Sequence, residues 1–216
     1  MLTNTITDVL FHLWLQTFQP FKISPLKLKT GFKKLVQAYS SAGRYYHTLQ
    51  HVHYVLVKVR YLQAYTQDLS LVEIAAWFHD VIYDSQAQDN EEKSANYASD
   101  LLNNLDIPNS CITTVQRLIL NTKHHQADDF DSQVLLDADL AILAAEAVDY
   151  QEYANAIRQE YAWVSDDEYI KGRTKVLEKF LQRQRIYFTP LMYDKSEQLA
   201  RANLQMEIKI LNDIHV

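Results

Sequence analysis

The strongest chemical signal in the chain is a pair of adjacent residues, His79 and Asp80, that follows an apolar run over residues 73–78. A histidine followed directly by an aspartate offers a nitrogen and a carboxylate oxygen from one short stretch of backbone. Burying both groups beside Trp77 and Phe78 costs free energy unless something satisfies them. A divalent cation would satisfy both at once.

Other parts of the chain offer partners for such a cation. His47 and His51 are four residues apart, so on one helix they would share a face, one turn above the other. Imidazole is the commonest metal-binding side chain. Asp139 lies in the apolar segment 134–143, where a carboxylate needs a partner. These residues are therefore candidate ligands from three separate segments.

Each of these residues also has an ordinary structural explanation. The His47 and His51 pair could be two partly buried polar residues. His79 could stabilise the C-terminal end of a helix through the helix dipole, with Asp80 in solvent. Asp139 could be a carboxylate favoured by the same kind of dipole, or a surface residue.

Composition limits the fold class and the partners. The 216 residues include only 3 Gly and 4 Pro, which favours long helices and argues against sandwiches, barrels and Gly-rich nucleotide loops. The net charge of −6 gives no global basic surface for a nucleic-acid polymer. The single cysteine, Cys111, excludes an internal disulfide framework and fits a reducing, cytoplasmic setting. No signal peptide is expected, and no apolar run approaches the roughly 18 residues that span a bilayer.

The spacing of apolar residues predicts a single all-α domain over residues 1–216, with a core at about 24–147 and a helical extension at 148–216. Ser24 with Pro25 predicts a helix start, and the Ser70–Glu73 and Ser165–Glu168 pairs have the form of capping boxes. Helices are expected over 5–19, 25–39, 46–66, 70–80, 91–104, 109–122, 134–147, 149–162, 166–184 and 196–212.

The order of the candidate ligands resembles that of the HD-domain superfamily of metal-dependent phosphohydrolases: a His, then a His-Asp doublet, then a distant Asp. The element Tyr46-His47-x-x-x-His51 is similar to one in the cyclic-nucleotide phosphodiesterases of that superfamily. There the second histidine binds metal and the first is a general acid. The resemblance implies that His51 is a ligand and His47 a proton donor. Ala138-Asp139-Leu140 matches a further element, which favours Asp139 over Asp137 as the ligand.

A closer resemblance covers nearly the whole chain. It looks like a bacterial family of predicted metal-dependent HD phosphohydrolases whose substrate is not established. The matching stretches are Gly43–His47, Trp77–Asp80, Asp89-Asn90-Glu91, Ser94-Ala95, Asp137–Leu140, Ile157-Arg158, Glu160-Tyr161, Gly172-Arg173, Ala200-Arg201 and Asn203-Leu204. The expected fold is thus an HD-domain helical bundle with additional C-terminal helices. The stretch from His79 to Asp84 also resembles guanosine tetraphosphate hydrolases, although Tyr83 stands where they have Glu.

The resemblance implies a metal-dependent phosphohydrolase acting on a phosphate ester, such as a nucleotide or a related small molecule. The expected metal ligands are His51, His79, Asp80 and Asp139, a mixed nitrogen and oxygen set that suits Mn, Fe, Ni, Mg or Zn. The expected catalytic groups are His47 as the acid and Asp80 as a proton acceptor from water. Four further residues are candidates for binding the substrate: Arg44, Lys123, Asp84 and Arg158.

Two other functions remain open at this point. The chain could be a non-catalytic regulatory module that binds metal and nucleotide. It could instead be an HD-type di-iron oxygenase, in which His124 or His125, with Asp84, would hold a second metal. The simpler explanation of His124 and His125 is a pair at a helix C-terminus. A homodimer is compatible with the sequence, but no specific feature requires it.

Overall fold

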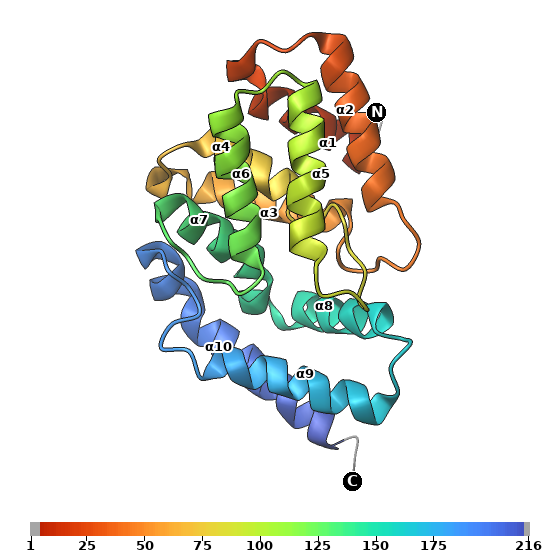
Figure 1. Cartoon of the computed structure of the whole chain (residues 1–216). Helices are drawn as coiled ribbons and strands as arrows, with labels where there is room; N and C mark the ends of the chain where they lie inside the picture. Colours follow the sequence, from red (N-terminus) through yellow and green to blue (C-terminus); the bar gives the residue numbers. More distant parts are fainter. Residues whose placement is uncertain (1–4, 214–216) are drawn as a thin grey trace.

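Ten α-helices make up the part of the chain, residues 5–213, that the computed structural model describes (Figure 1). They are α1 (Ile6–Thr17), α2 (Pro25–Tyr39), α3 (Leu49–Tyr61), α4 (Leu69–Phe78), α5 (Asn90–Asn104), α6 (Asn109–Thr122), α7 (Phe130–Asp139), α8 (Ala147–Glu160), α9 (Asp166–Leu181) and α10 (Pro190–Asp213). Three short 3₁₀ turns, at 19–21, 63–65 and 140–144, connect some of them. These residues contain no strand, so the predicted all-α class is confirmed. None of the helices they form is both long and apolar enough to cross a bilayer.

Helix α4 lies at the centre of the upper body, defined as helices α1 to α7. Every residue from Leu71 to Phe78 is buried. A helix that is apolar on all sides is stable only when other helices surround it, and α1, α3, α5, α6 and α7 all contact α4. The indole of Trp77 donates to Thr17, and the hydroxyl of Tyr39 donates to the Trp77 carbonyl. This packing fixes the position at which α4 ends, immediately before His79.

The start of α3 differs from the expected one. A helix was predicted from residue 46, but α3 begins at Leu49, with Thr48 as its N-cap. His47 therefore precedes the helix, and the prediction that His47 and His51 share one helix face is wrong. The difference lies in the turn before the helix: Thr48 has extended backbone angles (φ −118°, ψ −178°), and the backbone N–H groups of residues 45–47 converge on a distant carboxylate, described below.

Other helix boundaries also moved because of tertiary contacts. Asp68 caps α4 in place of Ser70, while Glu73 is buried and binds Arg60 (2.6 Å) and Thr17 (2.7 Å). Helix α7 begins at Phe130 and ends at Asp139, where the chain tightens into a 3₁₀ turn, so the helix expected at 134–147 is divided. Helix α10 begins at Pro190, six residues before the expected start, in agreement with the preference of proline for the first turn.

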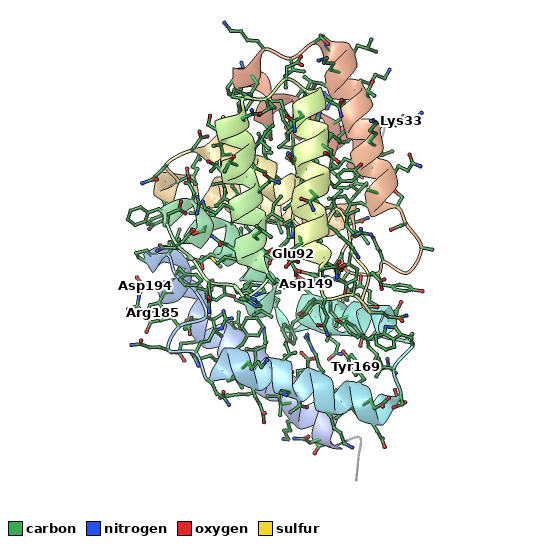
Figure 2. The ribbon with its side chains drawn as sticks, in the orientation of Figure 1. Lys33, Glu92, Asp149, Tyr169, Arg185 and Asp194 are labelled. Carbon is green, nitrogen blue, oxygen red and sulfur yellow. The ribbon has the colours of Figure 1, made fainter. Side chains whose placement is uncertain are left out.

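Helices α8, α9 and α10 lie below the upper body (Figure 1). Both α8 and α10 contact the 3₁₀ turn at 140–144, and α9 packs against α10. A buried ion pair joins α9 to α10, with Arg173 Nε 2.7 Å from Glu207 Oε1. Side chains, Tyr169 among them, occupy the space between the ribbons of α8 and α9 (Figure 2). The chain after residue 147 thus closes one side of the region where α3 begins and where α4 and α7 end.

Candidate metal centre

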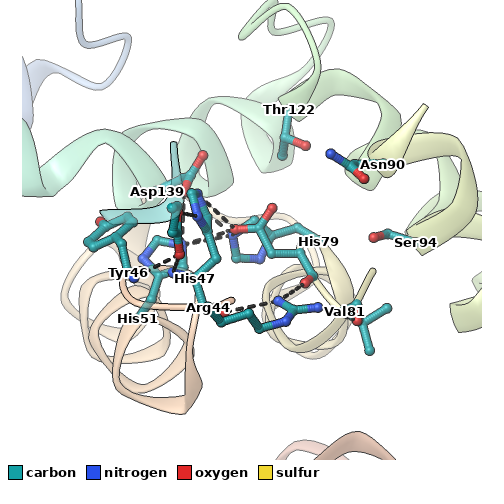
Figure 3. A network of polar contacts seen from close by, with 12 residues as sticks. Arg44, Tyr46, His47, His51, His79, Val81, Asn90, Ser94, Thr122 and Asp139 are labelled. Atoms are coloured by element: carbon teal, nitrogen blue, oxygen red, sulfur yellow. Dashed lines mark hydrogen bonds and ion pairs between the residues drawn. The ribbon is translucent and has the colours of Figure 1, made fainter. Parts of the chain in front are cut away.

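The four residues expected as metal ligands lie close together, and Figure 3 labels three of them, His51, His79 and Asp139. His51 comes from the first turn of α3, His79 and Asp80 directly follow α4, and Asp139 is the last residue of α7. Helices α3, α4 and α7 pack pairwise against one another, so the packing of the core fixes the positions of the four side chains. One ligand atom from each lies within 4.8 Å of all the others, and the group could hold a metal ion.

The spacing of the donor atoms fits a single small divalent cation. His51 Nε2 lies 3.0 Å from His79 Nε2, 3.3 Å from Asp80 Oδ2 and 3.3 Å from Asp139 Oδ1. His79 Nε2 lies 3.0 Å from Asp80 Oδ2 and 3.4 Å from Asp139 Oδ1. Two ligands with bonds of about 2.1 Å are about 3.0 Å apart at a right angle and about 3.4 Å apart at a tetrahedral angle. The observed separations span this interval.

Hydrogen bonding fixes the His79 ring in the form that binds metal. Its Nδ1 donates to the Ala76 carbonyl at 2.9 Å, so Nε2 carries a lone pair. That lone pair faces another imidazole nitrogen and two carboxylate oxygens. The Nδ1 of His51 is buried without a hydrogen-bond partner. Such a convergence of lone pairs and negative charge is unfavourable without a positive charge at the centre.

The pKa shifts of the four groups also indicate that the site favours a positive charge. Burial acts to raise the pKa of Asp80 and Asp139, but the neighbouring histidines outweigh it and hold the pKa of both well below the usual range. Burial acts to lower the pKa of His51 and His79, yet the two carboxylates raise the pKa of both. In the absence of a cation, protons supply the positive charge that the site requires.

His47 lies next to this cluster and is held there by Glu160 of α8. Its Nδ1 donates to Glu160 Oε2 at 2.7 Å, while Nε2 lies 3.9 Å from Asp80 Oδ2. Glu160 Oε1 accepts from the backbone N–H groups of Tyr45, Tyr46 and His47 at 2.8–2.9 Å. Burial acts to raise the pKa of Glu160, but the His47 hydrogen bond and charge outweigh it, and the pKa falls to about 2. The ionised carboxylate therefore fixes which nitrogen of His47 faces the cluster.

The sequence did not assign this role to Glu160, which was named only within a stretch that resembles the HD family. Tyr83 is a second such residue, since its ring stacks on His47 with centroids 4.0 Å apart. Glu160 is 113 positions from His47, and no periodic pattern connects the two. The only signal in the sequence was the position of each residue inside a stretch that resembles the HD family.

Arg44, which was expected to bind phosphate, makes four hydrogen bonds within the protein. Its guanidinium donates to the carbonyls of His47, Asp80 and Val81 at 2.8–2.9 Å and to the Ser41 hydroxyl at 2.9 Å. These bonds satisfy carbonyl groups left free at the end of α4 and tie the His47 turn to Asp80. Four of the five N–H groups of the guanidinium are thereby committed.

The other three candidates for substrate binding also have protein partners. The Lys123 ammonium binds Glu92 and the Gln88 carbonyl. Arg158 binds Asp166 at 2.6 Å and the carbonyls of residues 161 and 164. Asp84 is exposed and accepts from the backbone N–H of Gln86. The structure brings none of the three to the cluster.

The two consecutive histidines have different surroundings. His124 is exposed. His125 faces the cluster, with Nε2 3.5 Å from Asp139 Oδ2, the carboxylate oxygen opposite the one that faces His51 and His79. Its backbone is left-handed, with φ +49°, which is uncommon for a residue other than glycine. Asp84 does not join them, and the described residues contain no second group of three or more His, Cys, Asp or Glu side chains that could hold a metal.

In comparisons with known proteins, no family model matches the chain, and no curated protein matches its sequence.

Proposed function

We propose that the protein is a metal-dependent phosphohydrolase of the HD type that hydrolyses a phosphate ester of a small molecule. The observation that carries this proposal is the convergence of His51, His79, Asp80 and Asp139, with His47 beside them. Two imidazoles and two carboxylates suit Mn, Fe, Ni, Mg or Zn. A divalent cation bound there supplies Lewis acidity, which makes a water more acidic and neutralises charge on phosphoryl oxygens.

The protein's own groups would divide the remaining work. Asp80 is placed to accept a proton from the attacking water. His47 is placed to hold a proton at Nε2 and to give it to the leaving oxygen, because Glu160 occupies its other nitrogen. Glu160 is a positioning residue, since it contacts His47 and the backbone before it but not the cluster. Proximity of these groups to a bound ester would lower the entropic part of the barrier.

The two alternatives have less support from the geometry. A di-iron oxygenase needs donors for a second ion, and within residues 5–213 His125 is the one histidine besides His47, His51 and His79 that faces the cluster. A non-catalytic binding module would not need His47 to be held by a buried carboxylate with four hydrogen bonds. Iron near two per chain with O₂ consumption would favour the first alternative, and metal binding without turnover the second.

The test measures metal and turnover together. Protein purified without chelators is analysed for metal and screened for phosphate release with added Mn. We expect about one divalent ion per chain, and we expect His79→Ala and His51→Ala to lose both the metal and the activity. His53→Ala is the matched control, because His53 lies on α3 but outside the cluster. Full metal retention in His51→Ala and His79→Ala would overturn the assignment.

A further inference from the structure

A chamber of about 640 Å³ opens beside the metal cluster. His47, His125 and Asp139 form the wall at the cluster, and residues of α8 and α9 form the opposite wall. A volume of this size is typical of sites for small organic molecules. A ligand that reaches the cluster through this chamber would therefore place one end at the cluster and the rest against α8 and α9.

Seven aromatic side chains form a large part of the walls of the chamber. They are Tyr46, Tyr83, Tyr153, Tyr161, Trp163, Tyr169 and Phe180. Trp163 is about half exposed, and its indole donates to the Ser85 hydroxyl at 2.8 Å, which joins the two loops that line the chamber. Aromatic rings offer large apolar surfaces that favour flat organic groups over small polar ones. The buried hydroxyl of Tyr46 has no hydrogen-bond partner.

The chamber offers little positive charge for additional phosphate groups. Arg173 is the one Arg or Lys among its described lining residues, and it is already bound to Glu207 at 2.7 and 3.1 Å and to the Tyr153 hydroxyl at 3.2 Å. The lining also includes the carboxylate of Glu168. Recognition of a di- or triphosphate relies on free guanidinium or ammonium groups. The site can therefore accommodate the negative charge of one phosphoryl group, bound at the cluster.

Gly172 of α9 provides a position where the chamber can be filled. It lines the chamber, its φ is unremarkable, and a Cβ built there meets no atom within 4 Å. A side chain at this position would take up chamber space without touching the metal ligands. Its neighbour Lys175 is exposed on the same helix and does not line the chamber.

From these features we infer that the substrate is a phosphate monoester with a single phosphoryl group on an uncharged leaving group that carries an aromatic ring system. The inference rests on the proposed function. In the reaction the bond between phosphorus and the ester oxygen breaks, and water oxygen forms a new bond to phosphorus. The leaving oxygen takes a proton, so the products are the ring-bearing alcohol and inorganic phosphate.

The first experiment compares two esters of primary alcohols, 2-(1-naphthyl)ethyl phosphate and propyl phosphate. Their leaving groups have similar intrinsic reactivity, so a difference in kcat/KM reports binding of the ring system. We expect kcat/KM to be at least about tenfold higher for the naphthyl ester, because its ring buries apolar surface in the chamber. The matching naphthylethyl diphosphate should be a poorer substrate than the monophosphate. Equal rates for the two monoesters, or a preference for the diphosphate, would overturn the inference.

The second experiment changes the chamber. Gly172→Phe should raise KM for the naphthyl ester by about tenfold or more, and should raise KM for propyl phosphate by much less. Lys175→Phe, the control on the same helix, should change neither substrate, and all variants should keep their metal. Unchanged kinetics of Gly172→Phe with the naphthyl ester would contradict the assignment of the chamber.

A binding measurement separates this inference from the proposed function. The corresponding phosphonates, with CH₂ in place of the ester oxygen, are titrated into metal-loaded protein in a calorimeter. If the naphthyl phosphonate binds at least about tenfold more tightly and Gly172→Phe removes the difference, the chamber is correctly assigned even when no ester is hydrolysed. Turnover restricted to small phosphates or diphosphates would support the hydrolase and refute the chamber.

Discussion

At the scale of single residues, Glu160 connects the candidate metal centre to the backbone around it. One buried carboxylate binds three consecutive N–H groups and the ring of His47. Glu160→Gln keeps an acceptor oxygen but loses the charge opposite His47. We expect kcat to fall about 10- to 100-fold, with KM changed little and the metal retained. Glu152→Gln, an exposed change on the same helix, should leave kcat unaltered, and a Glu160→Gln enzyme with full kcat would refute the positioning role.

Glu160 also makes stability depend on pH. Its pKa in the folded protein, about 2, lies below the ordinary value of 4.5. A lowered pKa means that its stabilising contribution is present above about pH 4.5 and disappears as the pH falls toward 2. The contribution is at most roughly 3 kcal/mol, from 1.36 kcal/mol for each pKa unit. Urea unfolding should therefore show Glu160→Gln less stable than the wild type at pH 7, by a margin that narrows at pH 3. If the difference in the free energy of unfolding between Glu160→Gln and the wild type is the same at both pH values, the loss of stability comes from packing instead.

The residue types of the metal centre could be predicted from the sequence, but the partners of several residues could not. His79 and Asp80 could be identified because burying a polar pair at the end of an apolar helix costs free energy unless a partner such as a cation satisfies it. Arg44 was expected to bind phosphate because its type and position near His47 fit that role. In the structure the Arg44 guanidinium donates hydrogen bonds to the carbonyls of Asp80 and Val81, which are 36 and 37 positions away. Such pairings depend on the tertiary fold, which local spacing does not determine.

At the scale of helices, Asp137 joins the end of α7 to the start of α10. Its carboxylate accepts from the N–H groups of Phe188 and Thr189 at 2.7 Å and from the Thr189 hydroxyl at 2.6 Å. Asp137→Ala would leave these donors without an acceptor, and we expect the free energy of unfolding to fall by about 3 kcal/mol. Burial raises the pKa of Asp137 to about 6. Asp137→Asn keeps one acceptor oxygen but turns an NH2 group toward a donor at the other position, so it should also be less stable than the wild type, by less than Asp137→Ala.

Urea unfolding of both variants, with metal analysis alongside, checks this prediction. Metal should be retained in each, because Asp139 and not Asp137 faces the cluster. A loss in Asp137→Ala no larger than that in Asp137→Asn would show that a single acceptor oxygen at this position adds nothing to the stability.

The helices that were predicted well are those with strong local signals. Helix α2 begins at Pro25, directly after the Ser24 cap, and α6 covers the expected residues 109–122. The start of α3 and the division after α7 were missed because long-range contacts decide them. Before α3, the N–H groups of residues 45–47 converge on one oxygen of Glu160, a contact that local residue spacing does not reveal.

At the scale of the whole molecule, the C-terminal helices complete the candidate site. The sequence predicted that residues 148–216 form an extension packed on a core. In the structure α8 supplies Glu160, and α8 and α9 form the outer wall of the chamber. Because the wall and the ligands belong to different helices, closure of the site depends on the packing of the whole chain.

A bound cation should therefore stabilise the whole fold. Four ligands drawn from α3, the end of α4 and α7 come together only in the folded chain, so metal binds the native state in preference to the unfolded one. At a free metal concentration of a hundred times Kd the gain is about 2.7 kcal/mol, or roughly 5–10 °C in Tm for a chain of this size. Chelation with EDTA should lower Tm by this amount, and added Mn should restore it.

Protons compete with the cation, because the two carboxylates raise the pKa of His51 and His79. The imidazoles must lose these protons to bind metal, so the Tm gain should be larger at pH 8 than at pH 6. His79→Ala should show no gain at either pH, while His53→Ala should behave as the wild type. A gain that is independent of pH, or one that persists in His79→Ala, would mean that the cation binds elsewhere on the protein.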